Sequence, residues 1–141
     1  MERYKQVQNI IIARHSLPIR FTNKVNFNGP VPENRPELGP CWEWTANTGH
    51  NGYGQFKLNG RTLRAHRFSW LILCGPIPDG LETDHLCKNR RCVNPDHIEP
   101  VTRQTNILRG NSKAAQNAKV THCPKGHPYD LSNTYFYPKS R

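Results

Sequence analysis

Residues 83–106, TDHLCKNRRCVNPDHIEPVTRQTN, hold two His, two Cys, two Asp and three Asn among three Arg and one Lys. Residues 81–86 have the pattern of a strand, 87–92 that of a loop and 93–102 that of a short return strand with Pro-containing turns. A helix is expected to follow over 103–110, where Gly110 ends it. The stretch therefore predicts two strands, a loop and a helix, and its side chains can form one metal site, two sites or none.

The sulfur ligands suggest a zinc site. Cys87 and Cys92 form a C-x4-C pair, His97 follows at the same interval, and Cys41 lies far upstream. Zinc is held by four Cys or His ligands in a tetrahedron, and closely spaced ligands allow one loop to supply most of them. The alternative is two buried structural cysteines beside an unrelated histidine.

A second group offers oxygen ligands for a hard cation. The Asp84 carboxylate and the Asn106 amide can bind Mg²⁺ and leave positions open for water and phosphate oxygens. His85 has the pKa range of a base that accepts a proton near neutral pH. Neighbouring residues of a strand point to opposite faces, however, and an isolated Asp-His pair is also compatible with a polar strand end.

Composition points to one small core and a polyanionic partner. The chain has 141 residues, with 20 Lys and Arg against 10 Asp and Glu, so its formal charge is +10. A basic balance of this kind suits nucleic acid better than an acidic membrane surface. No apolar run is long enough to span a bilayer, and the N-terminus lacks a signal-peptide core, so a cytoplasmic protein is expected. Five Cys cannot all pair within one chain, which favours thiols that are free or metal-bound over disulfides.

The rest of the chain divides into three parts. Residues 1–40 are interpreted as an N-terminal arm followed by a Pro- and Gly-rich linker. Residues 41–67 predict a small antiparallel sheet with a tight turn at Asn59-Gly60, and a buried helix then ends at Gly75. Residues 113–141 are a polar connector and a small separate element. The aromatic residues are expected in the core, as is the Cys74 thiol; the aromatic set is Trp42, Trp44, Tyr53, Phe56, Phe68 and Trp70.

A resemblance adds to this pattern. The segment DHLCKNRRCVNPDHIEPVTRQTN, preceded by CWEW, GYGQF and RAHRFSW, resembles the HNH endonucleases of phage genomes, which belong to the ββα-metal or His-Me finger group. The spacing of its zinc ligands is similar to that of His-Cys box homing endonucleases. The resemblance covers roughly residues 20–135. It implies an α+β fold in which a β-hairpin and a helix surround one catalytic divalent ion, with an HNH nuclease domain at 41–112 and the ββα-metal core at 81–110.

The resemblance also implies roles for single residues. His85 matches the general base, Asp84 the first ligand of the catalytic ion, and Asn106 the ligand on the helix. The four residues Cys41, Cys87, Cys92 and His97 match a structural zinc site. Asn94 occupies the place of the middle letter of HNH, but Asn-Pro is first a turn signal, so we assign it to loop shape.

Basic residues of the 41–67 region are the candidates for DNA contact. In the family the matching sheet lies on DNA, and a strand-borne Arg can neutralise the cleaved phosphate, for which its planar fork is well suited. A solvated charged face is the alternative for each of them. The candidates are Lys57, Arg61, Arg64 and Arg67.

The C-terminal part departs from the family pattern. Cys123 and His127 form a C-x3-H half-site, and relatives often follow it with a CxxC pair that completes a zinc ribbon. This sequence has no such pair before Arg141, so a vacant half-site is expected, and completion of the site by His122 and water is the alternative.

The function expected from these residues is that of a metal-dependent HNH DNA endonuclease. It would use Mg²⁺ or Mn²⁺ at the catalytic site and Zn²⁺ at the structural site, bind double-stranded DNA as a monomer or weak dimer, and nick one strand at a time. The alternative is a non-catalytic, zinc-stabilised DNA-binding protein, which has no need of the combination of Asp84, His85 and Asn106. A nuclease directed at RNA is a third, weaker candidate.

Overall fold

The computed structural model describes residues 16–133, and the chain divides into two compact units, Met1–Thr102 and Arg103–Arg141. Among the described residues, three two-stranded antiparallel sheets accompany short helices, which confirms the α+β class. The elements of the first unit, in chain order, are α2 (Ile19–Thr22), β1 (Val25–Asn26), a 3-10 turn η1 (Pro36–Leu38), β2 (Glu43–Trp44), β3 (Gln55–Leu58), β4 (Arg61–Arg64), α3 (Ala65–Cys74), β5 (Leu81–His85), a 3-10 turn η2 (Pro95–His97) and β6 (Ile98–Thr102).

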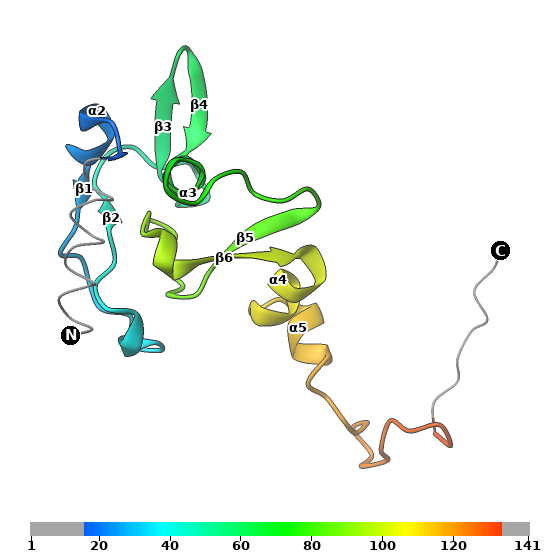
Figure 1. Ribbon diagram of the computed structural model, residues 1–141. Helices are drawn as coiled ribbons and strands as arrows, with labels where there is room; N and C mark the ends of the chain where they lie inside the picture. Colours follow the sequence, from blue (N-terminus) through cyan, green and yellow to red (C-terminus); the bar gives the residue numbers. More distant parts are fainter. Residues whose placement is uncertain (1–15, 134–141) are drawn as a thin grey trace. The chain divides into compact units, whose positions relative to one another are not determined.

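The β3–β4 hairpin leads directly into α3. Asn59 and Gly60 have φ angles of 47° and 76°, so this Asn-Gly pair forms the expected tight turn, and Leu58 pairs with Arg61 across it. Helix α3 begins at the next residue after β4 and ends before Gly75, whose φ of 92° suits glycine best. In Figure 1, α3 lies between this hairpin and the β5–β6 hairpin.

The β5–β6 hairpin carries the segment with which the sequence analysis began. Asp84 pairs with Glu99 and His85 pairs with Ile98, and the long connection between the strands holds the Cys residues and η2. Asn94 caps η2, because its side-chain oxygen accepts a hydrogen bond from the Asp96 backbone N–H at 3.1 Å. The assignment of Asn94 to loop shape is therefore confirmed.

An aromatic cluster forms the core of the first unit. Phe21 is fully buried, and its ring lies 5.0 Å from Trp44, 5.1 Å from Phe56 and 5.2 Å from Phe68. Leu17 is buried in the same cluster. Residues from the segment expected to be an arm and linker thus contribute directly to the core, and β1 of that segment pairs with β2.

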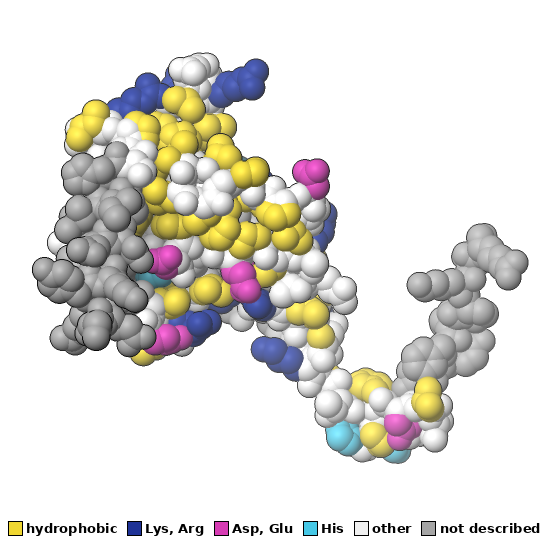
Figure 2. All heavy atoms as spheres, in the orientation of Figure 1, with side chains coloured by type: hydrophobic (Ala, Val, Ile, Leu, Met, Phe, Trp, Pro, Cys, Tyr) yellow, Lys and Arg dark blue, Asp and Glu magenta, His cyan; other side chains and the backbone are white. Residues whose placement is uncertain are grey.

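Three side chains differ from the expected burial. Tyr53 and Trp70 are only half-buried, and Cys74 is exposed, so the prediction that its thiol is buried was wrong. For Trp70 and Cys74 the reason lies in α3, which is apolar on more than one side. One face packs on the core, while the other leaves Leu71 50% and Ile72 42% exposed, and Figure 2 shows apolar side chains gathered on this part of the surface.

The second unit contains α4 (Arg103–Arg109) and α5 (Lys113–Asn117), and the two helices contact each other. Ser112 caps α5, because its hydroxyl accepts a hydrogen bond from the Ala115 N–H at 3.2 Å. No helix in the described part of the chain has the length and apolar character needed to cross a membrane.

Candidate metal and active site

Four predicted zinc ligands meet in the first unit. The Sγ atoms of Cys41, Cys87 and Cys92 and a ring nitrogen of His97 all lie within 4.8 Å of one another, and all four side chains are buried. His97 Nδ1 lies 3.5 Å from Cys41 Sγ and 3.6 Å from Cys92 Sγ. Three thiols and one imidazole are a donor set that fits tetrahedral zinc, so this cluster could hold a zinc ion.

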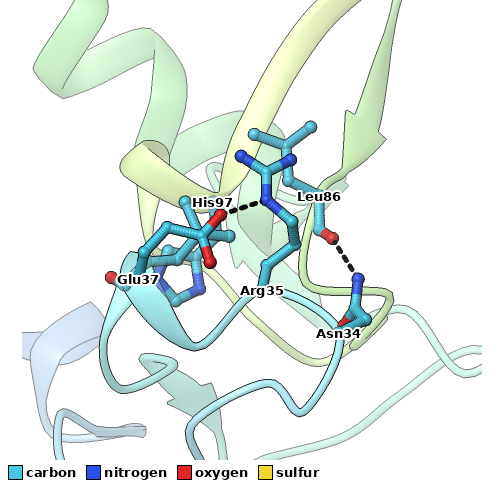
Figure 3. A network of polar contacts seen from close by, with 6 residues as sticks. Asn34, Arg35, Glu37, Leu86 and His97 are labelled. Atoms are coloured by element: carbon cyan, nitrogen blue, oxygen red, sulfur yellow. Dashed lines mark hydrogen bonds and ion pairs between the residues drawn. The ribbon is translucent and has the colours of Figure 1, made fainter.

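The His97 ring is oriented from outside the cluster. Its Nε2 lies 3.0 Å from the Leu38 carbonyl oxygen. A carbonyl can only accept, so Nε2 carries a hydrogen and Nδ1 is the nitrogen that faces the thiols. The loop that carries Leu38 is held in place by Asn34, whose side chain donates to the Leu86 carbonyl at 3.1 Å, and by an ion pair between Arg35 and Glu37 (Figure 3).

The electrostatics of the cluster favour thiolates. Hydrogen bonding from Cys92 lowers the pKa of Cys87 and of Cys41, and the same two contacts raise the pKa of Cys92, which keeps its proton. Burial works against the charge on His97, but contacts with Cys87, with the Leu38 carbonyl and with Cys41 raise its pKa to about 9. The sulfurs thus face His97 Nδ1, a nitrogen that readily takes up a proton. A divalent cation can replace that proton in such a site.

The loop between the Cys residues is also fixed to β2. The Trp44 N–H donates to the Arg91 carbonyl at 2.9 Å, and the Arg91 side chain donates back to the Trp44 carbonyl at 3.0 Å. On the other side, the Val93 N–H donates to the Trp42 carbonyl at 2.8 Å. These bonds hold Cys92 beside the strand that follows Cys41.

His85 lies at the end of β5, and a hydrogen bond determines its tautomer. Its Nε2 is 3.0 Å from the Cys92 carbonyl oxygen, so Nε2 carries the hydrogen and Nδ1 keeps the lone pair. The side chain is 5% exposed, and this burial lowers the pKa of His85, while the Cys92 carbonyl acts in the opposite direction. At neutral pH the ring is therefore uncharged and able to accept a proton.

Asp84 precedes His85 and is also buried, at 7% exposure. Its Oδ1 lies 3.5 Å from Lys88 Nζ. Glu99 lies directly opposite Asp84 on β6, on the same face of the hairpin. The two acidic side chains are therefore neighbours, and a cation beside them would offset their repulsion. Sequence reasoning did not single out Glu99, because only the strand register reveals its position.

The other predicted residues are distributed over both units. Asn106 lies on α4, so its partnership with Asp84 remains a prediction. Cys123 Sγ and His127 Nδ1 lie 3.6 Å apart in the second unit, where they offer two ligand atoms. The predicted DNA contacts Lys57, Arg61, Arg64 and Arg67 are exposed on β3, β4 and α3, and Figure 2 shows Lys and Arg side chains at the end of the hairpin.

Two histidine rings and a tyrosine pack together beside the candidate base. The His66 ring lies 4.7 Å from the His85 ring, and Tyr53 lies 5.2 Å from His66 and 5.7 Å from His85. His66 Nε2 is 3.1 Å from Thr83 Oγ1, whereas its Nδ1 is buried without a partner in the described structure. Burial, with His85 and two nearby Arg, lowers the pKa of His66 to about 3. No local sequence pattern predicts this packing, since the three rings come from separate segments.

Comparison with known proteins confirms the resemblance. The family described as HNH endonuclease matches residues 63–108, a segment that runs from β4 through α3 and the β5–β6 hairpin into α4. This segment contains Asp84, His85 and Asn106, together with three of the four clustered metal ligands. Over residues 63–108 the chain is thus similar to HNH endonucleases.

Two phage proteins are similar to this chain. "Protein 7.7" of Escherichia phage T7 is 36% identical over 66 residues, which are 47% of this chain and 51% of the T7 protein. "Uncharacterized gene 5.3 protein" of Enterobacteria phage T3 is 42% identical over 48 residues, which are 34% of this chain and 48% of the T3 protein. The chain thus spans about half the length of these curated relatives. No solved structure matches significantly.

Proposed function

We propose that the protein is a metal-dependent endonuclease that hydrolyses phosphodiester bonds of double-stranded DNA, with His85 as the general base. The observation that carries this proposal is the hydrogen bond from His85 Nε2 to the Cys92 carbonyl. It leaves Nδ1 as the nitrogen that takes a proton from an attacking water, and it stabilises the ring once that proton has arrived.

Asp84 and Asn106 are the residues that would hold the catalytic ion. A carboxylate and an amide are oxygen donors that suit Mg²⁺ or Mn²⁺. When bound, such an ion supplies positive charge next to the phosphate and the leaving oxygen. The pairing of Asp84 with Glu99 on one face of the hairpin supports a cation at this place.

The Cys41, Cys87, Cys92 and His97 cluster is proposed to hold a structural Zn²⁺. All four positions are filled by buried protein ligands, as in structural rather than catalytic zinc sites. The formal charge of +10 supports a DNA partner, to which exposed Arg and Lys would bind mainly through phosphates. With one candidate site per chain, we propose that a monomer nicks one strand, and the similarity to phage proteins supports action in a host cytoplasm.

A plasmid assay tests this function. Supercoiled DNA is incubated with the purified protein and Mg²⁺, Mn²⁺ or a chelator, and nicked and linear products are separated on a gel. We expect nicked circles first, dependence on the divalent ion, and a loss of about 10²- to 10⁴-fold in His85→Ala. If His85→Ala cleaves as fast as the parent protein, with the same zinc content and melting temperature, the base is wrongly assigned. Binding without any cleavage would instead support a zinc-stabilised DNA-binding protein.

A further inference from the structure

Tyr53 is surrounded by two imidazoles and two guanidinium groups. Besides the rings of His66 and His85, the Cζ atoms of Arg64 and Arg90 lie 5.0 Å and 5.6 Å from the centre of its ring. Arg64 is the last residue of β4, whereas Arg90 lies in the loop that carries the Cys ligands. One aromatic ring therefore brings two cations from separate segments next to the candidate base.

The backbone around Tyr53 holds the ring in a fixed place. Gly52 has a φ of 81°, which few other residues adopt, and its N–H donates to the Gly49 carbonyl at 2.8 Å. A Cβ on Gly54 would lie 2.7 Å from Trp44 Cδ1, so the chain passes directly against the core at this point. The two glycines thus fix the position of Tyr53 from both sides.

Arg90 has a second anchor, and both charges lack an acidic partner. Arg90 Nη1 donates to the Asn51 carbonyl at 2.9 Å, which ties its guanidinium to the loop that carries Tyr53. In the described part of the chain, neither Arg64 nor Arg90 forms an ion pair with Asp or Glu. Two guanidinium groups on one ring repel each other unless an anion lies between them, and a phosphate accepts several of their N–H donors at once.

We propose that Arg64 and Arg90 together bind one backbone phosphate of the nucleic acid beside His85, and that Tyr53 is the positioning residue that holds both. This inference rests on the proposed function, because it takes a phosphodiester as the ligand. It adds Arg90 and Tyr53 to the site and selects Arg64 from the basic residues on the hairpin and α3. All four contacts of Tyr53 with the surrounding His and Arg side chains are made by its ring, so the inference assigns no role to its hydroxyl.

The first test is the salt dependence of DNA binding. Each phosphate contact contributes about 0.9 to the slope of log affinity against log salt. We expect Arg64→Gln/Arg90→Gln and Tyr53→Leu each to make the slope shallower by about 0.9, and Tyr53→Phe to keep the parent slope. Tyr53→Leu changes no charge, so its effect would come from displaced guanidinium groups. If Tyr53→Leu keeps the slope of the parent protein, Tyr53 does not hold the two Arg side chains in place. If the slope of the double variant is shallower by about 1.8, Arg64 and Arg90 contact two phosphates and not one.

The second test is cleavage at saturating DNA. We expect kcat to fall about 10²-fold in Arg64→Gln, in Arg90→Gln and in Tyr53→Leu, at unchanged melting temperature and zinc content, and to be restored in Tyr53→Phe. Arg20→Gln is the matched control, since Arg20 also lies over an aromatic ring, Phe56, at 5.2 Å and donates to a backbone carbonyl, that of Lys57. Its kcat should not change. If Tyr53→Leu has the same kcat as the parent protein, the inference is contradicted. If the parent protein cleaves no DNA, the proposed function is contradicted, and the salt slopes alone then decide whether Arg64 and Arg90 bind a phosphate.

Discussion

Replacing Cys41 by alanine should remove a large part of the stability of the first unit. Cys41 is 1% exposed, and it is the ligand that comes from before β2, whereas the other three come from the β5–β6 connection. An ion bound by both segments closes a loop of roughly 45 residues, and a cross-link over such a loop stabilises by about 4 kcal/mol through lost entropy of the unfolded chain. Domains of this size are stable by about 5–15 kcal/mol, so this loss is large.

The assay combines zinc content with unfolding. We expect about one zinc per parent chain by elemental analysis and much less in Cys41→Ala, together with a strong fall in the urea midpoint. Cys74→Ala is the matched control, because it also removes a thiol, but an exposed one outside the cluster. A strong chelator should lower the urea midpoint of the parent protein to that of Cys41→Ala. It should change the midpoint of that variant little.

A Cys41 thiol that binds no metal would give a different result. Simple loss of a buried sulfur costs about 1 kcal/mol, whether or not a metal is bound, and is insensitive to chelators. If Cys41→Ala retains one zinc per chain, or unfolds within about 1 kcal/mol of Cys74→Ala with no chelator effect on the parent, Cys41 does not join the two segments through a metal.

Three further predictions concern the active site and its surroundings. DNA affinity should fall linearly with salt on a log–log scale, with a slope of about −0.9 for each phosphate contacted, and an affinity independent of salt would exclude a phosphate-dominated interface. Asp84→Ala and Asn106→Ala should reduce cleavage and recover in part at higher Mg²⁺ or Mn²⁺, whereas His85→Ala should not recover, because extra metal supplies no proton acceptor; equal recovery in all three would disprove these separate roles. His66 has a folded-state pKa of about 3, below its unfolded value, so its contribution to stability is present above pH 6.5 and is lost as pH falls. Between pH 7.5 and 5 the parent should lose about 2 kcal/mol more than His66→Gln in urea melts at equal zinc content, and identical losses would show that His66 is not buried in the neutral form.

Local sequence signals predicted the parts of the fold that depend on neighbouring residues. The Asn59-Gly60 turn and the end of α3 at Gly75 follow from backbone preferences that each residue carries by itself. Three residues of the cluster, Cys87, Cys92 and His97, also follow from a local spacing that is typical of zinc sites, whereas Cys41 lies far upstream of them.

Contacts between distant segments were beyond such signals. The pairing of Val25 with Trp44 joins β1 to β2. Each strand has two residues and is too short to show an alternating pattern. Exposure of Cys74 depends on which apolar face of α3 the core covers, and composition alone does not show this. Tyr53 was counted as core because aromatic residues usually are, whereas its ring is half-buried beside His85.

The metal cluster and the candidate base are joined through one residue. Cys92 contributes its Sγ to the cluster and its carbonyl oxygen to His85 Nε2. The orientation of the candidate base therefore depends on the position of the Cys92 backbone, which the cluster and the hydrogen bonds to β2 hold in place. Partial removal of zinc under conditions where the chain stays folded should accordingly reduce cleavage more than DNA binding. All the proposed phosphate contacts except Arg90 lie on β3, β4 and α3, outside the cluster, whereas the tautomer of His85 loses its support. Parallel loss of cleavage and binding at each zinc content would show instead that the metal only keeps the chain folded.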